Sequence, residues 1–129
     1  MSDSTMIEIS KAEFEVLEVL WQQSPVDAQQ VIAVLNEDKS WHDKTVKTLL
    51  NRLVKKEAVG YEKEQRKYLY YPLIARDEYT SKESSSFIER MFRGKIAPLV
   101  AGFASKNDLK KEDVEALKSI IKQWENEND

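Results

Sequence analysis

Hydrophobic side chains recur at helical spacing in the first half of the chain, and capping residues mark where the runs begin. Ser10 stands three residues before Glu13, which is the pattern of a capping box at a helix N-terminus. Asp27 and Gln30 give a second capping signal of the same kind. With the apolar positions that follow, these patterns predict three helices, over residues 11–23, 28–37 and 43–57.

The pattern changes to strand-like residues after the third predicted helix. Tyrosines and aliphatic residues on both sides of a polar tip at 65–67 predict a hairpin with strands over 59–64 and 68–73. Pro72 stands at the end of the second strand, where a residue without a backbone N–H removes no ladder bond. Three helices followed by a hairpin are the plan of a winged helix-turn-helix, in which the hairpin is the wing.

The rest of the chain returns to helical spacing, with helices predicted over 77–93, 96–105 and 111–126. Their apolar side chains are more than three short helices can bury among themselves. They could fold back on the N-terminal domain, but a symmetric dimer interface is favoured because it also pairs two copies of that domain. The predicted dimerisation residues are Phe87, Met91, Phe92, Ile96, Leu99, Val100, Phe103, Val114, Leu117, Ile121 and Trp124.

These patterns together predict a mainly α chain with one small β-hairpin. A winged-helix domain is expected over residues 1–75 and a helical dimerisation domain over 76–129. The length of 129 residues suits one ordinary domain or a small domain with an appendage, and 3 Gly and 3 Pro argue against a many-turned β protein.

The amino-acid composition excludes several kinds of functional site. The absence of cysteine excludes disulfides, thiol catalysis and thiolate metal sites, and one histidine makes a multi-His zinc site implausible. That residue, His42, is expected to cap the third helix, as Asp43 could also do, or to contact a phosphate. We therefore expect no cofactor, no metal and no enzymatic activity. No apolar run approaches a membrane span and no secretory signal is evident, which predicts a cytoplasmic protein without direct membrane binding.

Charge is unevenly distributed along the chain. The net charge is −3, yet residues 39–67 carry nine Lys/Arg against four Asp/Glu, a local +5, and the remainder carries −8. A basic segment on an acidic chain is a phosphate-binding footprint or, more commonly, a solvated face.

The residues of the third predicted helix favour a phosphate-binding segment over a solvated face. At 100° per residue, its apolar side chains fall on one face and Lys, Thr, Asn and Arg fall opposite, with no carboxylate in 44–56. Such side chains suit a DNA major groove, where a carboxylate would be repelled by phosphates. The wing tip adds Lys63 and further positive charge. The DNA-binding candidates are Lys44, Thr45, Lys47, Thr48, Asn51, Arg52, Lys55, Arg66 and Lys67.

Position along the helix suggests their roles. The N-terminal half of a recognition helix meets base edges, so the base-contact candidates are Lys44, Thr45, Lys47 and Thr48. Asn51 and Arg52 could reach bases or phosphates, whereas Lys55, Arg66 and Lys67 are expected on phosphates. The alternative is a winged helix that docks on proteins, but such a domain would expose apolar residues on this face.

Three segments resemble the penicillinase repressor family (BlaI/MecI/CopY): residues 9–21, 43–56 and the tyrosine-rich wing 67–72. The resemblance covers roughly residues 7–126. It implies a homodimeric transcriptional repressor in the bacterial cytoplasm that binds double-stranded palindromic operator DNA of β-lactamase or related resistance genes. It also implies that the N-terminal half of the third helix faces the operator, with the wing on the backbone.

Two branches of that family differ from this chain in informative ways. The copper-responsive branch ends in Cys-x-Cys motifs, and the lack of cysteine excludes that sensing mechanism here. The β-lactam branch is induced when a membrane sensor with a zinc protease domain leads to cleavage between Asn and Phe in the dimerisation region. The matching segment 100–104 keeps Phe103 but has Gly102 in place of Asn. The Gly102–Phe103 bond is thus a candidate cleavage site, and a plain interface aromatic is the alternative for Phe103.

Overall fold

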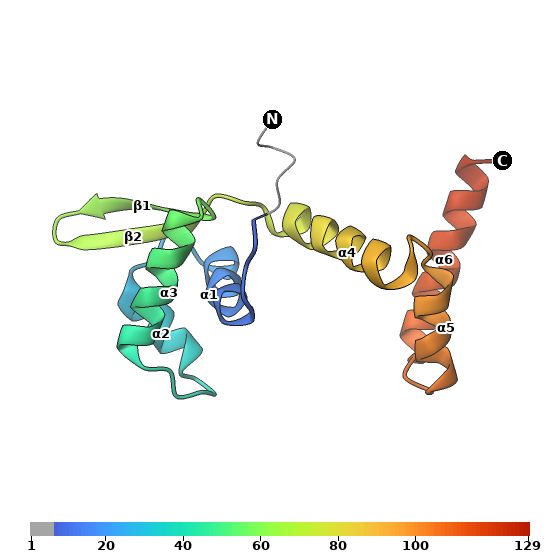
Figure 1. Cartoon of the computed structure of the whole chain (residues 1–129), viewed down its shortest axis with the longest axis horizontal. Coiled ribbons are helices and arrows are strands. Elements are labelled where there is room, and N and C mark those ends of the chain that lie inside the picture. The colour runs from blue at the N-terminus through green and yellow to red at the C-terminus, as the bar shows by residue number, and fades with distance from the viewer. Residues whose placement is uncertain (1–6) are drawn as a thin grey trace. The chain divides into compact units, whose positions relative to one another are not determined.

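The computed structural model describes residues 7–129, which divide into two compact units (Figure 1). The first unit runs through Lys82 and the second comprises residues 83–129. The division lies inside one long helix, whereas the predicted domain boundary after residue 75 stands at the start of that helix. Within the described range, no helix has the length and apolar character needed to cross a membrane.

Three helices form the body of the first unit: α1 (Lys11–Gln22), α2 (Ala28–Leu35) and α3 (Asp43–Lys55). Both predicted capping boxes are confirmed. The Ser10 hydroxyl accepts the Glu13 N–H at 3.1 Å, and the Glu13 carboxylate accepts the Ser10 N–H at 2.9 Å. Asp27 and Gln30 make the same reciprocal pair at 2.9 Å in each direction. These bonds satisfy backbone donors that the first turn of a helix leaves without partners.

Side chains from all three helices and from the hairpin share one core. Leu17 and Leu20 of α1, Val31 of α2 and Leu50 of α3 are fully shielded from solvent, and Val59 at the start of the hairpin is 1% exposed. Burial of this kind is the main stabilising contribution to a small domain. The core therefore fixes where α3 lies on the surface of the unit.

The hairpin consists of β1 (Val59–Glu64) and β2 (Lys67–Pro72), which pair antiparallel from Val59 opposite Pro72 to Glu64 opposite Lys67. Its second strand begins one residue earlier than predicted, because Lys67 belongs to the ladder and not to the turn. Gln65 takes a positive φ of 58° in the tight connection. Figure 1 shows the hairpin extending beyond the three helices of its unit.

A backbone bridge at Val26 attaches this hairpin to the segment before α2. The N–H of Val26 donates to the carbonyl of Tyr70 at 3.1 Å, and the N–H of Tyr70 donates back at 2.7 Å. Both side chains belong to the core. The base of the wing is thereby held against the helix-turn-helix, and only its distal part projects.

Three further helices follow: α4 (Arg76–Phe92), α5 (Ala97–Ser105) and α6 (Lys111–Glu127). Each lies within a residue or so of its predicted range. None of the three contains a buried residue. The second unit therefore has helices with apolar faces but no interior of its own.

Candidate nucleic-acid interface

Helix α3 presents a polar face because its apolar face is fixed in the core. Val46, Leu50 and Leu53 are fully buried and Leu49 is 4% exposed, as the helical wheel predicts. The opposite side is exposed along the whole helix. It carries every helix residue predicted to contact DNA: Lys44, Thr45, Lys47, Thr48, Asn51, Arg52 and Lys55.

The N-terminal half of this face borders a shallow hollow of about 530 Å³. His42 also lines it; this residue takes the N-cap position directly before α3, as predicted, but its side chain makes no capping hydrogen bond. A concave, basic surface with hydroxyl groups can accept a phosphate or a base edge. The residues lining it are His42, Lys44, Thr45, Thr48, Leu49 and Arg52.

The C-terminal end of α3 is anchored to α1 by an ion pair whose carboxylate is buried. The Lys56 ammonium donates to the Glu13 carboxylate at 2.6 Å and to the Glu8 carbonyl at 2.7 Å. Burial alone raises the pKa of Glu13, which is 1% exposed, but hydrogen bonds from Lys56 and Ser10 and the ammonium charge outweigh it. The net pKa of this carboxyl lies below its usual range, so it stays ionised and holds Lys56 in place.

The structure sorts the nine basic residues of 39–67 into two groups. Lys39 pairs with Glu15, Lys56 with Glu13, and Lys67 with Asp27 at 3.5 Å. The other six make no ion pair within residues 7–129, and they are the ones available to phosphates: Lys44, Lys47, Arg52, Lys55, Lys63 and Arg66.

Lys67 has features of both groups, because it is ion-paired and still accessible. It was predicted as a phosphate contact, and its side chain is 71% exposed even though it faces the Asp27 carboxylate. An exposed pair of this kind contributes at most about 1 kcal/mol. A phosphate can therefore compete with Asp27 for Lys67.

The two faces of the wing differ in chemistry. Cross-strand register places Tyr61 opposite Tyr70 and Lys63 opposite Tyr68, so these four side chains share one face. The ring centroids of Tyr61 and Tyr68 are 5.0 Å apart, and the Lys63 ammonium lies 6.0 Å from the Tyr68 ring. The other face carries Glu62. One face of the wing is thus aromatic and basic, and the other includes acidic groups.

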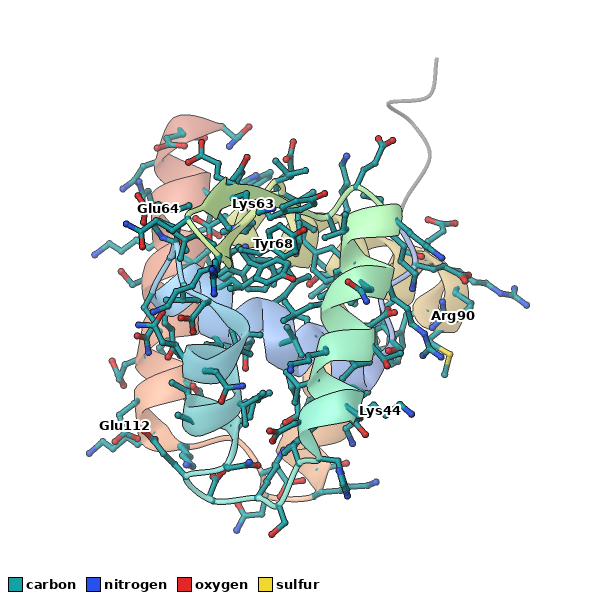
Figure 2. The ribbon with its side chains drawn as sticks, turned by 90° about the vertical axis from the view of Figure 1, so that its left-hand side faces the viewer. Lys44, Lys63, Glu64, Tyr68, Arg90 and Glu112 are labelled. Atoms are coloured by element: carbon teal, nitrogen blue, oxygen red, sulfur yellow. The ribbon has the colours of Figure 1, made fainter. Side chains whose placement is uncertain are left out.

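Tyr61 and Tyr68 were not predicted to contact DNA, yet both rings are 47% exposed. Figure 2 looks onto the side of the molecule where Lys44 marks the first turn of α3 and Lys63 and Tyr68 lie on the hairpin. Alternation along the predicted strands could have shown that the tyrosines share a face with Lys63. The tyrosines join the basic residues as candidate contacts.

The predicted dimerisation residues lie on α4, α5, α6 and the short connection before α5, and all are exposed or half-buried. Ile96 and Trp124 are each 62% exposed, and Met91 is 58% exposed. Ile120, which the helical stripe did not include, is 63% exposed. Several large exposed apolar side chains on one unit mark it as a candidate protein interface.

Gly102 and Phe103 lie inside α5, with hydrogen bonds on both sides of them. Phe103 is 49% exposed and nothing lies within 4 Å of the position a Gly102 side chain would take. A protease binds extended backbone, so cleavage here requires α5 to open first. A glycine within a helix lowers that cost by about 1 kcal/mol.

Known proteins are similar to this chain in sequence and in fold. The family model for the penicillinase repressor matches residues 9–123. The penicillinase repressor of Bacillus licheniformis is 34% identical over 119 residues, which cover 92% of this chain and 93% of the relative. The methicillin resistance regulatory protein MecI of Staphylococcus aureus (strain N315) is 33% identical, with 92% and 97% covered.

A solved structure matches the DNA-binding part. It is the solution structure of monomeric Bacillus licheniformis BlaI in complex with the blaP half-operator. It is 39% identical, with a TM-score of 0.50, and covers 58% of this chain and 92% of that one. This match confirms the predicted winged-helix fold. The family match extends over nearly the whole sequence, and the chain belongs to the penicillinase repressor family.

Proposed function

We propose that this protein is a sequence-specific DNA-binding transcriptional repressor that acts as a homodimer on a palindromic operator in the bacterial cytoplasm. The observation that carries the proposal is the outward face of α3, which is exposed, basic and rich in hydroxyl and amide groups along its length. A relative that is 39% identical over this region was solved on a half-operator. The family is one of repressors, and we assign no enzymatic activity to this chain.

Base reading is assigned to the first half of α3. Lys44 and Lys47 can donate to guanine acceptors, and Thr45 and Thr48 can contact base edges. Lys55 and the wing residue Arg66 are assigned to phosphates, which set affinity more than sequence preference. Asn51, Arg52 and Lys67 complete the candidate surface.

Homodimerisation is proposed from the apolar surface of the second unit. Its helices carry exposed rings and aliphatic side chains and bury none of them in the single chain. A second copy of the same surface would cover them, and C₂ pairing is the commonest form of self-association. Two heads joined in this way would read the two halves of a palindrome.

The regulated genes are proposed from the relatives, which are a penicillinase repressor and a methicillin resistance regulator. We place a resistance gene of this class under the control of this protein. Release of repression is assigned to a signal that breaks the dimer, for which cleavage at Gly102–Phe103 by a sensor protease system is the candidate. Cleavage there would divide the apolar surface on which dimerisation depends.

A docking domain without specific DNA binding is the second reading, and it is not favoured. A protein-docking face carries aromatic or aliphatic side chains at its centre. The exposed side of α3 has none of these beyond threonine methyl groups.

The test is a titration of the full-length protein with DNA from upstream of its own gene, beside a scrambled sequence, at two salt concentrations. We expect a preference of about 10³-fold or more for the upstream DNA and an affinity that falls steeply as salt rises. Equal, salt-independent binding of both DNAs would contradict the proposal and favour docking.

A further inference from the structure

The start of α4 is attached to α1 by charged and aromatic contacts. Arg76 Nη2 donates to Glu18 Oε2 at 2.9 Å, and the Arg76 guanidinium lies 5.5 Å from the centroid of the Trp21 ring. The Trp21 indole N–H also donates to the carbonyl of Ile74, two residues before α4 begins, at 2.9 Å. Arg76 and Ile74 are thus both tied to one side of α1.

One turn further along α4, an aromatic cluster also joins this helix to α1. The Tyr79 ring lies 6.0 Å from Phe14 and 6.2 Å from Trp21, and Phe14 and Trp21 are 5.7 Å apart at an angle of 69°. All three side chains are half-buried. Ring pairs at these separations attract one another beyond the burial of their area.

These contacts fix a helix at its root. Because α4 is one continuous helix from Arg76 to Phe92, its first turns contact α1 in the winged-helix unit while its later turns belong to the second unit. Its later turns carry Phe87 and Met91, which belong to the proposed dimer surface. The same helix therefore begins on the DNA-reading unit and ends on the surface that would pair two copies.

We propose that Trp21, Arg76 and Tyr79 are positioning residues for operator recognition, which fix α4 on each DNA-reading unit and so determine the half-site spacing that the dimer accepts. This inference rests on the proposed function. None of the three residues lies on the outward face of α3 or on the wing, so their effect on DNA passes through geometry. A restrained dimer gains bivalent affinity only where both half-sites are at the correct distance, whereas a loosely tethered one tolerates several distances.

The experiment compares full-length wild type with Tyr79→Ala on operator DNA identified by footprinting upstream of its own gene. Each protein is titrated with a single half-site, with the natural operator, and with operators whose spacer is changed by 2 or 5 base pairs; 5 base pairs is about half a helical turn. For wild type we expect about a 10²-fold loss on the 5-base-pair operator. For Tyr79→Ala we expect less than about a 10-fold loss there, with half-site affinity and dimer dissociation constant unchanged.

Two controls separate positioning from general damage. Tyr79→Phe keeps the ring and should retain a spacing profile nearer to wild type than Tyr79→Ala does. Ser81→Ala changes an exposed residue of the same helix and should match wild type. If Tyr79→Ala does not fold, Glu18→Lys, which places a like charge beside Arg76, serves in its place.

Each outcome is decisive. Lower affinity of Tyr79→Ala for all DNAs by one common factor indicates a merely structural role and overturns the inference. A wild-type profile without spacing dependence overturns it as well, while the proposed repressor function stands. Failure of wild type to prefer upstream DNA at all overturns both.

Discussion

The two units of this chain treat their apolar side chains in opposite ways. Every buried apolar residue in the described range lies between Val16 and Tyr70, in the winged-helix unit. The second unit buries none, and Ile120 and Trp124 in α6 are more than 60% exposed. Helices without a buried apolar face are only marginally stable in water. The winged-helix unit thus has a complete core within one chain, whereas the second unit leaves its apolar side chains available for the proposed pairing with a second copy.

A substitution in the core of the winged-helix unit should cause the greatest loss of stability. Leu50→Ala removes a fully buried side chain from the core of α3 and should lower the free energy of unfolding by about 2–5 kcal/mol. Urea denaturation followed by circular dichroism, at fixed protein concentration, measures it. Lys55→Ala, on the exposed side of the same helix, should stay within about 0.5 kcal/mol of wild type. Equal effects of the two substitutions would contradict the assigned faces of α3.

A charged substitution in the second unit tests whether its apolar surface forms the dimer interface. Ile121→Asp places a charge in the proposed dimer surface and should raise the dimer dissociation constant by about 100-fold or more, because a buried unpaired charge costs several kcal/mol. Sedimentation velocity over a concentration series measures this. The circular dichroism spectrum should keep the winged-helix signal, and Lys122→Ala is the matched control on α6. An unchanged dissociation constant would place the interface elsewhere.

Lys47 and Lys55, both on the exposed face of α3, should differ in how they contribute to DNA binding. Lys47→Ala should weaken binding to the operator by about 1–3 kcal/mol and weaken binding to scrambled DNA less, since its assigned partner is a base. Lys55→Ala should weaken both similarly and reduce the salt slope by about one. Fluorescence anisotropy at several salt concentrations distinguishes the two. Equal losses on both DNAs for Lys47→Ala would remove it from base reading.

The smallest expected effect concerns the anchor of α3. Glu13→Gln should lower the free energy of unfolding at pH 7 by about 1–2 kcal/mol, because it removes a charged hydrogen-bond acceptor for Lys56. The folded state lowers the pKa of Glu13, so its stabilising contribution is present above the unfolded pKa of about 4.3 and is lost as pH falls through the folded value. The difference between wild type and variant should therefore shrink below about pH 4. A difference that is constant from pH 7 to pH 3 would exclude the ionised pair as its cause.

Local patterns predicted most of the fold because the residues that decide it are close in sequence. The capping boxes at Ser10 and Asp27 and the apolar face of α3 depend on spacings of three or four residues, and all three are confirmed. The hairpin followed from its tyrosines, although its second strand begins one residue earlier and ends one residue earlier than predicted.

Long-range pairing could not be predicted in the same way. Nothing local indicates that Val26 bonds to Tyr70, or that Glu13, a cap residue, is buried beneath Lys56. Charge counts likewise assigned Lys39 and Lys56 to the basic patch, although α1 supplies acids that pair with both. The exposed face of α3 could be predicted from the sequence, because the apolar residues that are buried lie on one side of the helix and leave the other side exposed.

The most direct test of the account is the binding of full-length Ile121→Asp to a single half-site and to the whole operator, beside wild type. DNA reading is assigned to the first unit, and pairing of two copies is proposed for the second. We therefore expect equal half-site affinities for both proteins and a loss of about 10²-fold or more for the variant on the whole operator. A parallel loss on the half-site, with the winged helix still folded, would contradict the separation of the two units.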